Sequence, residues 1–254
     1  GEQDSDTSAV ILPSNIVLLG GNGYGDRYAN SVLFEPNDPD ESKRYKMLYT
    51  DFTRDQSDPL HREWPGLHAA FSKDGIHWEK PKLKAYLYKG KPTNIVNWRD
   101  HGTGVFKDPR DPDPERRYKM FCTAGAPGGR LHVAFSPDGI RWTKLIDTKI
   151  STAADTHNNA FWDPLAEEYV GITRAFSHGK MGYDLKGGIP WVSGFVIGQR
   201  VVARSTSKDF LKWSTPEIVF EYGHDKRQVY AMPSFYTHGV FLGLPVIYDN
   251  AGAY

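Results

Sequence analysis

The sequence has 254 residues, which is long enough for one large all-β domain or for two smaller domains. Its 31 basic residues balance its 31 acidic residues, which argues against a general nucleic-acid binder, and its single cysteine excludes an internal disulfide framework or a cysteine-based zinc cluster. No apolar run approaches the ~18 residues of a membrane span, no signal peptide opens the chain, and an aromatic content of 13% argues against a disordered protein.

The chain consists of repeated units, each made of short strands joined by turns. The first unit, about residues 30–90, begins with an apolar strand at Val32–Phe34 and a turn rich in Asn, Asp and Pro at Pro36–Pro39. A longer strand with β-branched and aromatic residues follows at Tyr45–Phe52. The unit closes with Ser72-Lys-Asp-Gly-Ile-His-Trp78, where Asp-Gly indicates a hairpin turn because glycine accepts a positive φ. We expect the Trp to lie on the last strand of the unit.

The second and third units repeat this order. The second, about residues 94–150, carries Arg117-Tyr-Lys-Met120 and then Ser136-Pro-Asp-Gly-Ile-Arg-Trp142. The third, about residues 157–222, carries the degenerate forms Glu168-Tyr-Val-Gly171 and Ser207-Lys-Asp-Phe-Leu-Lys-Trp213. An insertion loop at 177–193 separates two strands of this third unit. A fourth unit begins near residue 228 and is incomplete at residue 254.

Radially repeated four-stranded units are typical of a β-propeller, so we predict an all-β fold in which residues 1–254 form one domain. The repeated Trp side chains are expected to pack between neighbouring blades, and the Ser-x-Asp-Gly turns are expected to be structural. A propeller must close on itself, because open sheet edges are prone to unwanted pairing. We therefore expect the chain to be truncated in its fourth blade.

The same motifs resemble a known superfamily. They are the Tyr-Lys-Met strands, the two Ala-Phe-Ser-x-Asp-Gly-Ile-x-Trp segments, His157-Asn-Asn-Ala-Phe-Trp-Asp163 and Arg204-Ser-Thr-Ser-Lys-Asp-Phe-x-x-Trp213. From about Asn30 to Asp249 the chain is similar to the five-bladed β-propeller glycoside hydrolases, which include invertases, levansucrases, arabinanases and neoagarobiose hydrolases. It is particularly similar to bacterial family-32-like or family-43-like hydrolases. The resemblance implies a five-bladed propeller of four-stranded antiparallel blades.

The resemblance also implies a catalytic site at the narrow end of the channel, formed by residues that precede the first strand of each blade. In blade one, Asp26 is the only carboxylate of a glycine-rich segment and is the candidate base, with Asn30 as a substrate contact; the alternative is an Asp-capped turn. In blade two, Arg99-Asp100 resembles the Arg-Asp-Pro motif of invertase-like enzymes. In those enzymes the Asp holds sugar hydroxyls and stabilises the transition state, so the resemblance implies a catalytic role for Asp100. His101 stands in place of the Pro and is a candidate substrate contact. The alternative for this pair is a surface Arg–Asp contact.

Blade three carries the densest polar run. Invertase-like enzymes have a Glu near this point, which this sequence lacks, so either Asp155 or His157 is the candidate general acid. The neoagarobiose hydrolases provide a precedent for histidine, whereas the alternative is an Asx turn with a structural His. Asn158 and Arg174 are expected to bind the sugar. In blade four, Tyr230 is either a stacking platform for a sugar or a core residue.

The nine histidines form no His-Glu-x-x-His or His-x-His pair, which argues against zinc. The resemblance implies no required cofactor and leaves open a Ca²⁺ ion in the central channel. It further implies an oligosaccharide as the partner, no binding of nucleic acid or membrane, and a secreted or periplasmic location. Nothing in the sequence indicates the oligomeric state.

These inferences favour an exo-acting glycoside hydrolase that releases a terminal sugar, furanosidic or anhydro, from plant or algal oligosaccharides by acid/base catalysis. A base at Asp26 and an acid on blade three would face each other across the channel, which favours the inverting reaction with its ~6.5–9.5 Å separation. One alternative is a non-catalytic carbohydrate-binding propeller, favoured by the missing blade-three Glu. The other is a sialidase-like hydrolase, because the Ser-x-Asp-Gly repeat resembles an Asp box.

Overall fold

The computed structural model describes residues 28–53, 64–124, 130–151, 154–155, 157–176, 200–222 and 227–249. Within these residues nearly all regular structure is β-strand, and the only helices are two single 3-10 turns, η2 (Glu41–Lys43) and η3 (Pro114–Arg116). Every strand pair is antiparallel. The prediction of an all-β fold is therefore confirmed.

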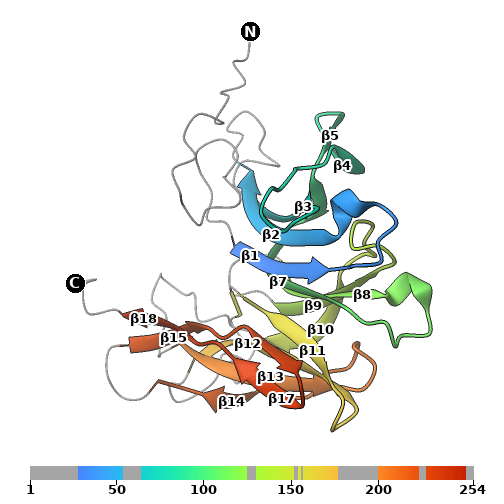
Figure 1. Ribbon diagram of the computed structural model, residues 1–254. Helices are drawn as coiled ribbons and strands as arrows, with labels where there is room; N and C mark the ends of the chain where they lie inside the picture. The colour runs from blue at the N-terminus through green and yellow to red at the C-terminus, as the bar shows by residue number, and fades with distance from the viewer. Residues whose placement is uncertain are drawn as a thin grey trace.

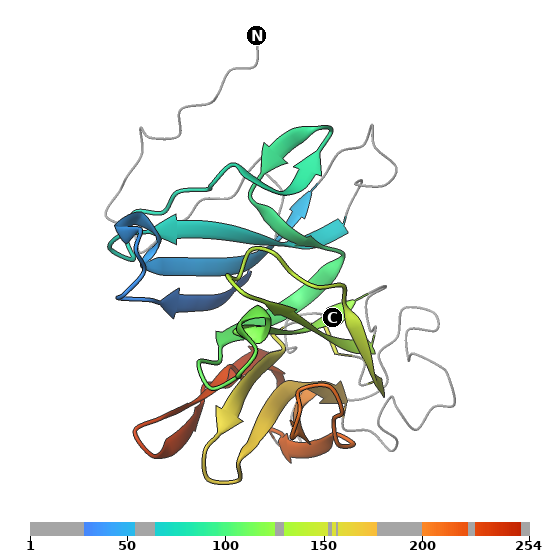
Figure 2. The same ribbon diagram turned by 90° about the vertical axis from the view of Figure 1, so that its right-hand side faces the viewer.

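Three four-stranded sheets follow one another along the chain (Figures 1 and 2). Blade one has the order β1-β2-β3-β6, with the bounds Tyr28–Phe34, Tyr45–Thr53, Trp64–Ser72 and Ile95–Trp98. Blade two is formed by β7, β8, β9 and β10, with the bounds Asp100–Lys107, Tyr118–Ala124, Arg130–Ser136 and Ile146–Ser151. Blade three is formed by β11, β12, β13 and β14, with the bounds Asn159–Asp163, Glu168–Phe176, Arg200–Ser207 and Glu217–Phe220.

A partial fourth blade follows. Its strands pair as β15 with β18 and β16 with β17, with the bounds Arg227–Ala231, Val246–Asp249, Ser234–Thr237 and Val240–Gly243. The first strands of the blades contact one another in sequence, β1 with β7, β7 with β11, and β11 with β16. Blades arranged in this way around their first strands form a β-propeller, and Figure 1 shows the successive sheets fanning out around these strands.

Blade one differs from the expected unit in its outer strand. The segment after Trp78 forms only an isolated bridge between Glu79 and Phe71, and Pro81, which has no N–H to donate, follows two residues after Glu79. A hairpin of β4 (Leu83–Tyr88) and β5 (Lys91–Thr93) intervenes, and β6 then pairs with β3. The sheet of blade one thus reaches Trp98. In all three blades the Trp of the repeat precedes the outer strand, so the prediction that it lies on this strand is wrong.

The Ser-x-Asp-Gly segments are turns held by their own side chains. In the first, Asp74 Oδ1 accepts hydrogen bonds from the two backbone N–H groups at positions 76 and 77, each at 2.8 Å. Ser72 Oγ accepts from Gly75 N at 2.9 Å, and Trp78 Nε1 donates to Gly75 O at 3.0 Å. The same Asx-type bonds surround Asp138 and Asp209. These turns are structural, as predicted.

The Tyr-Lys pair of the second strand also joins neighbouring blades. Lys119 is fully buried in blade two, where Nζ lies 3.2 Å from Asp108 and 2.7 Å from Asp111. Tyr169 of blade three donates a hydrogen bond of 2.7 Å to Asp108. In the same way Tyr118 of blade two donates to Glu35 of blade one. Blades two and three are therefore each linked to the preceding blade by a tyrosine that donates a hydrogen bond to a carboxylate.

The core lies mainly between blades. Leu48 and Leu67 of blade one pack with Val105 and Met120 of blade two, and Trp142 packs against this cluster. Trp213 packs against Phe121 of blade two, with the two ring centroids 4.8 Å apart. Both side chains thus lie between blades, as expected. No helix in the described part of the chain is long and apolar enough to cross a membrane.

Candidate functional site

Four polar side chains predicted to belong to the site meet where blades two and three begin. His101 lies on β7, Asp155 and His157 lie on the segment just before β11, and Arg174 lies near the end of β12. We call these four residues the polar cluster. Asp155 is at its centre, because His101 Nε2 lies 2.8 Å from Oδ1 and Arg174 Nη1 donates to Oδ2 at 2.7 Å.

The backbone explains why these groups come together. Asn158 N donates to Gly102 O at 2.8 Å, and Asn158 Nδ2 donates to the same oxygen at 3.0 Å, which ties the start of blade three to β7. A Cβ on Gly104 would lie 2.2 Å from Asn158 O, so only glycine allows this close approach. His157 has φ 56°, in the left-handed region, which reverses the chain between Asp155 and the first strand.

Electrostatics favour an ionised Asp155. Burial raises the pKa of this carboxyl, but the hydrogen bond from His101 and the charge of Arg174 outweigh the effect and lower the pKa below its usual value. Asp155 therefore carries a negative charge at neutral pH, with both oxygens committed to protein groups. This arrangement suits a residue that positions its neighbours and does not favour the role of general acid.

His157 is affected in a different way. Burial lowers the pKa of its imidazole, and the charges of Arg174 and His101 lower it further, against the opposing effect of Asp155. The imidazole is therefore neutral near pH 7 and able to accept a proton. Of the residues in the polar cluster, His157 has the chemistry best suited to proton transfer.

Asp100 lies beneath the cluster and does not reach solvent. Its side chain is fully buried, Asn97 Nδ2 donates to Oδ2 at 3.1 Å, and Oδ1 has no hydrogen-bond partner of good geometry among the described residues. Burial raises the pKa of this carboxyl to about 6, although Asn97 and Thr103 act in the opposite direction. This burial leaves Asp100 no access to a substrate and argues against the direct role that the resemblance implied.

Asn158 and Tyr230, which were predicted to contact the substrate, form hydrogen bonds within the protein. Asn158 is buried, and its amide oxygen accepts from Thr173 at 2.6 Å while its nitrogen donates to backbone oxygens, so its hydrogen-bonding groups are used within the protein. Tyr230 is half-buried on β15, and Arg174 Nε and Nη2 donate to its carbonyl oxygen at 3.1 and 2.9 Å. The Arg174 guanidinium also lies 4.4 Å from the centre of the Tyr230 ring.

The structure adds three neighbours that sequence reasoning missed. Arg200 at the start of β13 donates to Gln228 Oε1 at 3.0 Å, and its guanidinium lies 5.2 Å from the centre of the Tyr248 ring. Gln228 lies on β15 with Tyr230, in the segment that precedes β16. The sequence could therefore have indicated Gln228 as a site residue by the same argument that indicated Tyr230. The sequence around Arg200 and Tyr248 did not indicate a site, because these residues reach the cluster through the register of their strands.

The remaining predictions cannot be placed. Asp26 lies outside the described residues, and only the backbone of Asn30 is described, within β1. The insertion at 177–193 also lies outside them, between β12 and β13. Among the described residues no group of three or more His, Cys, Asp or Glu side chains is arranged to hold a metal ion.

No protein-family model matches the sequence, and no curated protein matches it. Among solved structures, the chain superposes on an N-acetylgalactosamine deacetylase from F. plautii in complex with blood group B trisaccharide, at 14% identity and a TM-score of 0.52. It also superposes on a β-fructofuranosidase from Schwanniomyces occidentalis complexed with fructosyl-erythritol, at 12% identity and a TM-score of 0.52. A third structure, described as a glycoside hydrolase, gives 15% identity and a TM-score of 0.51.

The matches cover 86%, 91% and 89% of this chain, but the chain spans only 61%, 41% and 66% of these three proteins. The fold is shared with propeller glycoside hydrolases. This confirms the resemblance in fold that the sequence motifs predicted. At such low identity the likeness concerns the fold and not the chemistry.

Proposed function

We propose that this chain is a carbohydrate-active hydrolase domain that releases a terminal sugar, and that the polar cluster is where the sugar binds. The observation that carries the proposal is the arrangement around Asp155, where a neutral histidine, an ionised carboxylate and an arginine come together at the first strands of two blades. Solved structures with the same fold include a glycoside hydrolase and proteins in complex with oligosaccharides.

In this proposal His157 transfers the proton and Asp155 is a positioning residue. Hydrolysis of a glycosidic bond adds water, so one group takes a proton from the water and another donates a proton to the leaving oxygen. The lowered pKa of His157 suits it to the first role near neutral pH. Asp155 holds His101 and Arg174 in place through its two oxygens. The sequence made Asp26 the candidate base and His157 a candidate acid; this proposal exchanges the two roles, so that Asp26 becomes the candidate proton donor.

The test combines turnover with binding. Wild type and His157→Gln would be incubated with a panel of plant and algal oligosaccharides, with released sugar measured by chromatography and binding measured by calorimetry. We expect wild type to release a monosaccharide and His157→Gln to lose ~10²–10⁴-fold in kcat while its KM changes little. His132→Gln is the matched control, since His132 lies on β9 outside the cluster and its Nδ1 bonds only a local carbonyl. Unchanged turnover in His157→Gln would overturn the assignment.

A second candidate, a non-catalytic carbohydrate-binding propeller, is favoured by one observation. Both oxygens of Asp155 are committed, and Asp100 is buried, so the described part of the cluster presents no carboxyl proton donor to a substrate. Sugar binding by wild type without any release of sugar, across the same panel, would decide for this candidate.

A further inference from the structure

A second arginine, Arg200, lies beside the polar cluster on the same sheet face as Arg174. In the β12–β13 ladder Arg174 pairs with Val202, and Phe176 pairs with Arg200. Residues two apart on a strand point to the same face, so Arg174 and Arg200 are diagonal neighbours. Their electrostatic interaction is direct, because Arg174 lowers the pKa of Arg200 in addition to the larger effect of burial.

Arg200 has no carboxylate partner among the described residues. Its Nη1 donates to the neutral amide of Gln228 at 3.0 Å, its Nε is buried without a hydrogen bond, and its Nη2 bonds no described residue. The charge of Asp155 acts on Arg200, but His101 and Arg174 already occupy both oxygens of this carboxylate. Among the described residues, the polar cluster and Arg200 together carry two guanidinium charges and one ionised carboxylate, and that carboxylate is bonded to Arg174.

Aromatic rings lie beside both arginines. The centroids of the Tyr230 and Tyr248 rings are 6.1 Å apart, with Arg174 against the first ring and Arg200 against the second. Tyr248 is exposed, which leaves ring surface next to the Arg200 guanidinium available to a ligand. Such a surface suits the C–H face of a sugar whose charged substituent contacts the arginine.

We propose that Arg200 binds the carboxylate of an acidic sugar, so that the substrate of this site is a uronate-containing oligosaccharide. The inference rests on the proposed function and specifies its substrate class. A guanidinium group matches the planar carboxylate through paired hydrogen bonds, which an uncharged hydroxymethyl group or ester cannot form.

The experiment compares matched acidic and neutral ligands. Binding of oligogalacturonides, their methyl esters, neutral galacto-oligosaccharides and sulfated galactan oligosaccharides would be measured by calorimetry for wild type, Arg200→Met and Arg204→Met. Arg204 is the control, because it lies on the same strand but outside the cluster. Its Nη2 forms an ion pair with Glu168 Oε1 at a distance of 3.2 Å. Thermal unfolding of each variant would verify that it folds.

We expect wild type to bind the uronate forms at least ~10-fold more tightly than their methyl esters, since charge-assisted hydrogen bonds contribute that much or more. Arg200→Met should lose this preference and Arg204→Met should keep it. Equal binding of acid and ester by wild type, a preference that persists in Arg200→Met, or selective binding of the sulfated ligands would overturn the carboxylate assignment. If neutral oligosaccharides are hydrolysed without such a preference, the inference fails while the proposed function stands; if no sugar binds or reacts, both fail.

Discussion

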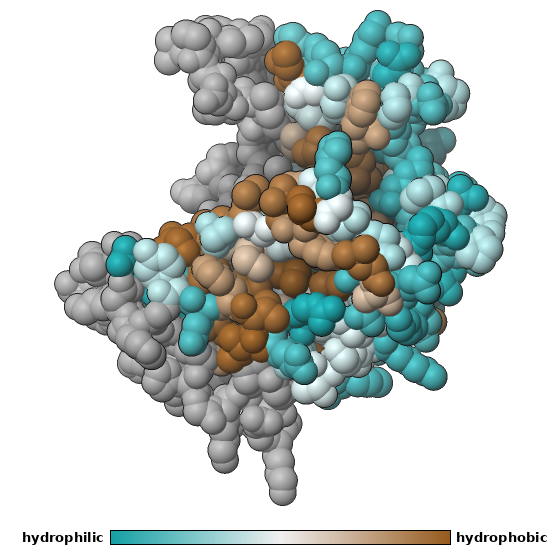
Figure 3. Space-filling view, turned by 60° about the horizontal axis from the view of Figure 1, so that its bottom comes forward, coloured by the Kyte–Doolittle hydropathy of each residue, from teal (hydrophilic) through white to brown (hydrophobic). Residues whose placement is uncertain are grey.

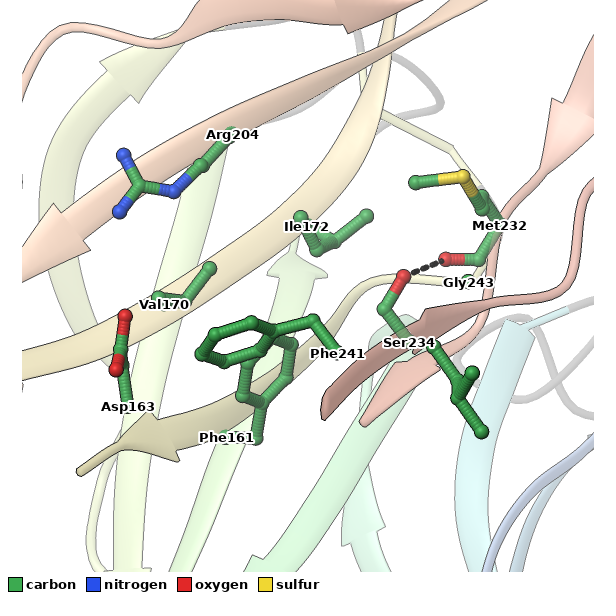
Figure 4. Close-up of a pocket in the computed structure, with 10 residues that line it drawn as sticks. Phe161, Asp163, Val170, Ile172, Arg204, Met232, Ser234, Phe241 and Gly243 are labelled. Atoms are coloured by element: carbon green, nitrogen blue, oxygen red, sulfur yellow. Dashed lines mark hydrogen bonds between the residues drawn. The ribbon is translucent and has the colours of Figure 1, made fainter. Parts of the chain in front are cut away.

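The two faces of blade three are packed differently. On the face toward blade two, Phe210 is fully buried, and five aromatic ring centroids lie within 5.1–6.5 Å of its own, those of Phe106, Phe121, Phe135, Tyr169 and Trp213. On the face toward the partial fourth blade, a cavity of about 350 Å³ lies between β11, β12 and β13 on one side and β16 and β17 on the other (Figure 4). We refer to these as the closed and the open interface.

Strand register shows that the two interfaces use equivalent positions. In blade two, Phe106 pairs with Lys119 and Phe121 pairs with Val133. The three apolar residues pack in the same cluster as Phe210, and Lys119 Nζ lies 5.5 Å from the centre of the Tyr169 ring of that cluster. In blade three the equivalent pairs are Phe161 with Val170 and Ile172 with Arg204, and these four line the cavity. The strands of the two blades thus present comparable faces. The difference is the Ser-x-Asp-x turn that inserts Phe210 and Trp213 into the closed interface.

The open interface also carries exposed apolar surface. Figure 3, which brings the lower side of Figure 1 forward, shows hydrophobic side chains gathered on this side of the molecule. Large apolar residues exposed on β16, β17 and their flanks include Phe235, Val240, Phe241, Leu242 and Leu244. The closed interface is therefore filled by side chains from the Ser-x-Asp-x turn of the next blade. Where no such turn inserts its side chains, the facing strands leave a cavity.

The largest effect is expected at the centre of the closed interface. Phe210→Ala removes a fully buried ring and should lower the free energy of unfolding by about 3–5 kcal/mol. Phe241→Ala is the matched change at the open interface, where the side chain is 45% exposed, and should cost no more than about 1 kcal/mol. Urea unfolding of both variants measures the two values. Equal losses would show that the open interface is as well packed as the closed one.

The second-largest loss of stability is expected when the buried lysine of the closed interface, Lys119, is replaced. Lys119→Met leaves Asp108 and Asp111 without their buried cation, so we expect a loss of about 3 kcal/mol. Lys149→Met, which removes an exposed lysine from its contact with Asp147, should change stability by less than about 0.5 kcal/mol. The equivalent position in blade three is Val170, so the open interface has no counterpart of this ion pair. A neutral effect of Lys119→Met in chemical denaturation would contradict its structural role.

A third prediction concerns charge under the polar cluster, at the boundary of blades one and two. The folded-state pKa of Asp100 is raised to about 6, so protonated Asp100 stabilises the fold fully below pH ~4, and this contribution is lost as pH rises through about 6. The shift corresponds to about 2–3 kcal/mol. Relative to Asp100→Asn, which does not titrate, wild type should therefore lose stability by up to that amount between pH 4 and 7. Unfolding curves across this range would show it, and a difference that stays flat would disprove the burial of this charge.

The smallest change in stability is expected from a substitution that adds volume next to the cavity of the open interface. Val170→Leu adds one methylene group next to the cavity and should stabilise the protein by up to about 0.8 kcal/mol. Val133→Leu makes the same change at the closed interface, where the side chain is fully buried, and should destabilise it by about 1 kcal/mol or more. Opposite signs in the two melting temperatures would sharpen the comparison. Destabilisation by both substitutions would mean that the cavity does not accept an added group.

Much of the fold could be predicted from the sequence, because the repeat is local. Asp74 and its equivalents form their turns through bonds to residues two and three positions away, so the motif alone specifies the structure. The same local reasoning made Asp155 and His157 candidates, because both precede a first strand. The outer strand of blade one was harder to predict, because it follows a hairpin that the other units do not contain.

The features that sequence reasoning missed depend on contacts between distant segments. Arg200 reaches the cluster through its register with β12 and through Gln228 on another blade. The burial of Asp100 and the full use of the Asn158 amide result from packing between blades, which residue type does not reveal. The strands of a blade were therefore easier to predict than the side chains that meet between blades.

The central claim, that a sugar binds at the polar cluster, is tested most directly by NMR of histidine side chains during titration with the oligosaccharide panel. The account predicts that the imidazole resonances of His101 and His157 shift together on binding, while those of His77 and His132, which lie on an outer turn and on β9, remain unchanged. Assignment would use His→Gln variants one at a time. Sugar binding that leaves the His101 and His157 resonances unmoved would contradict the account.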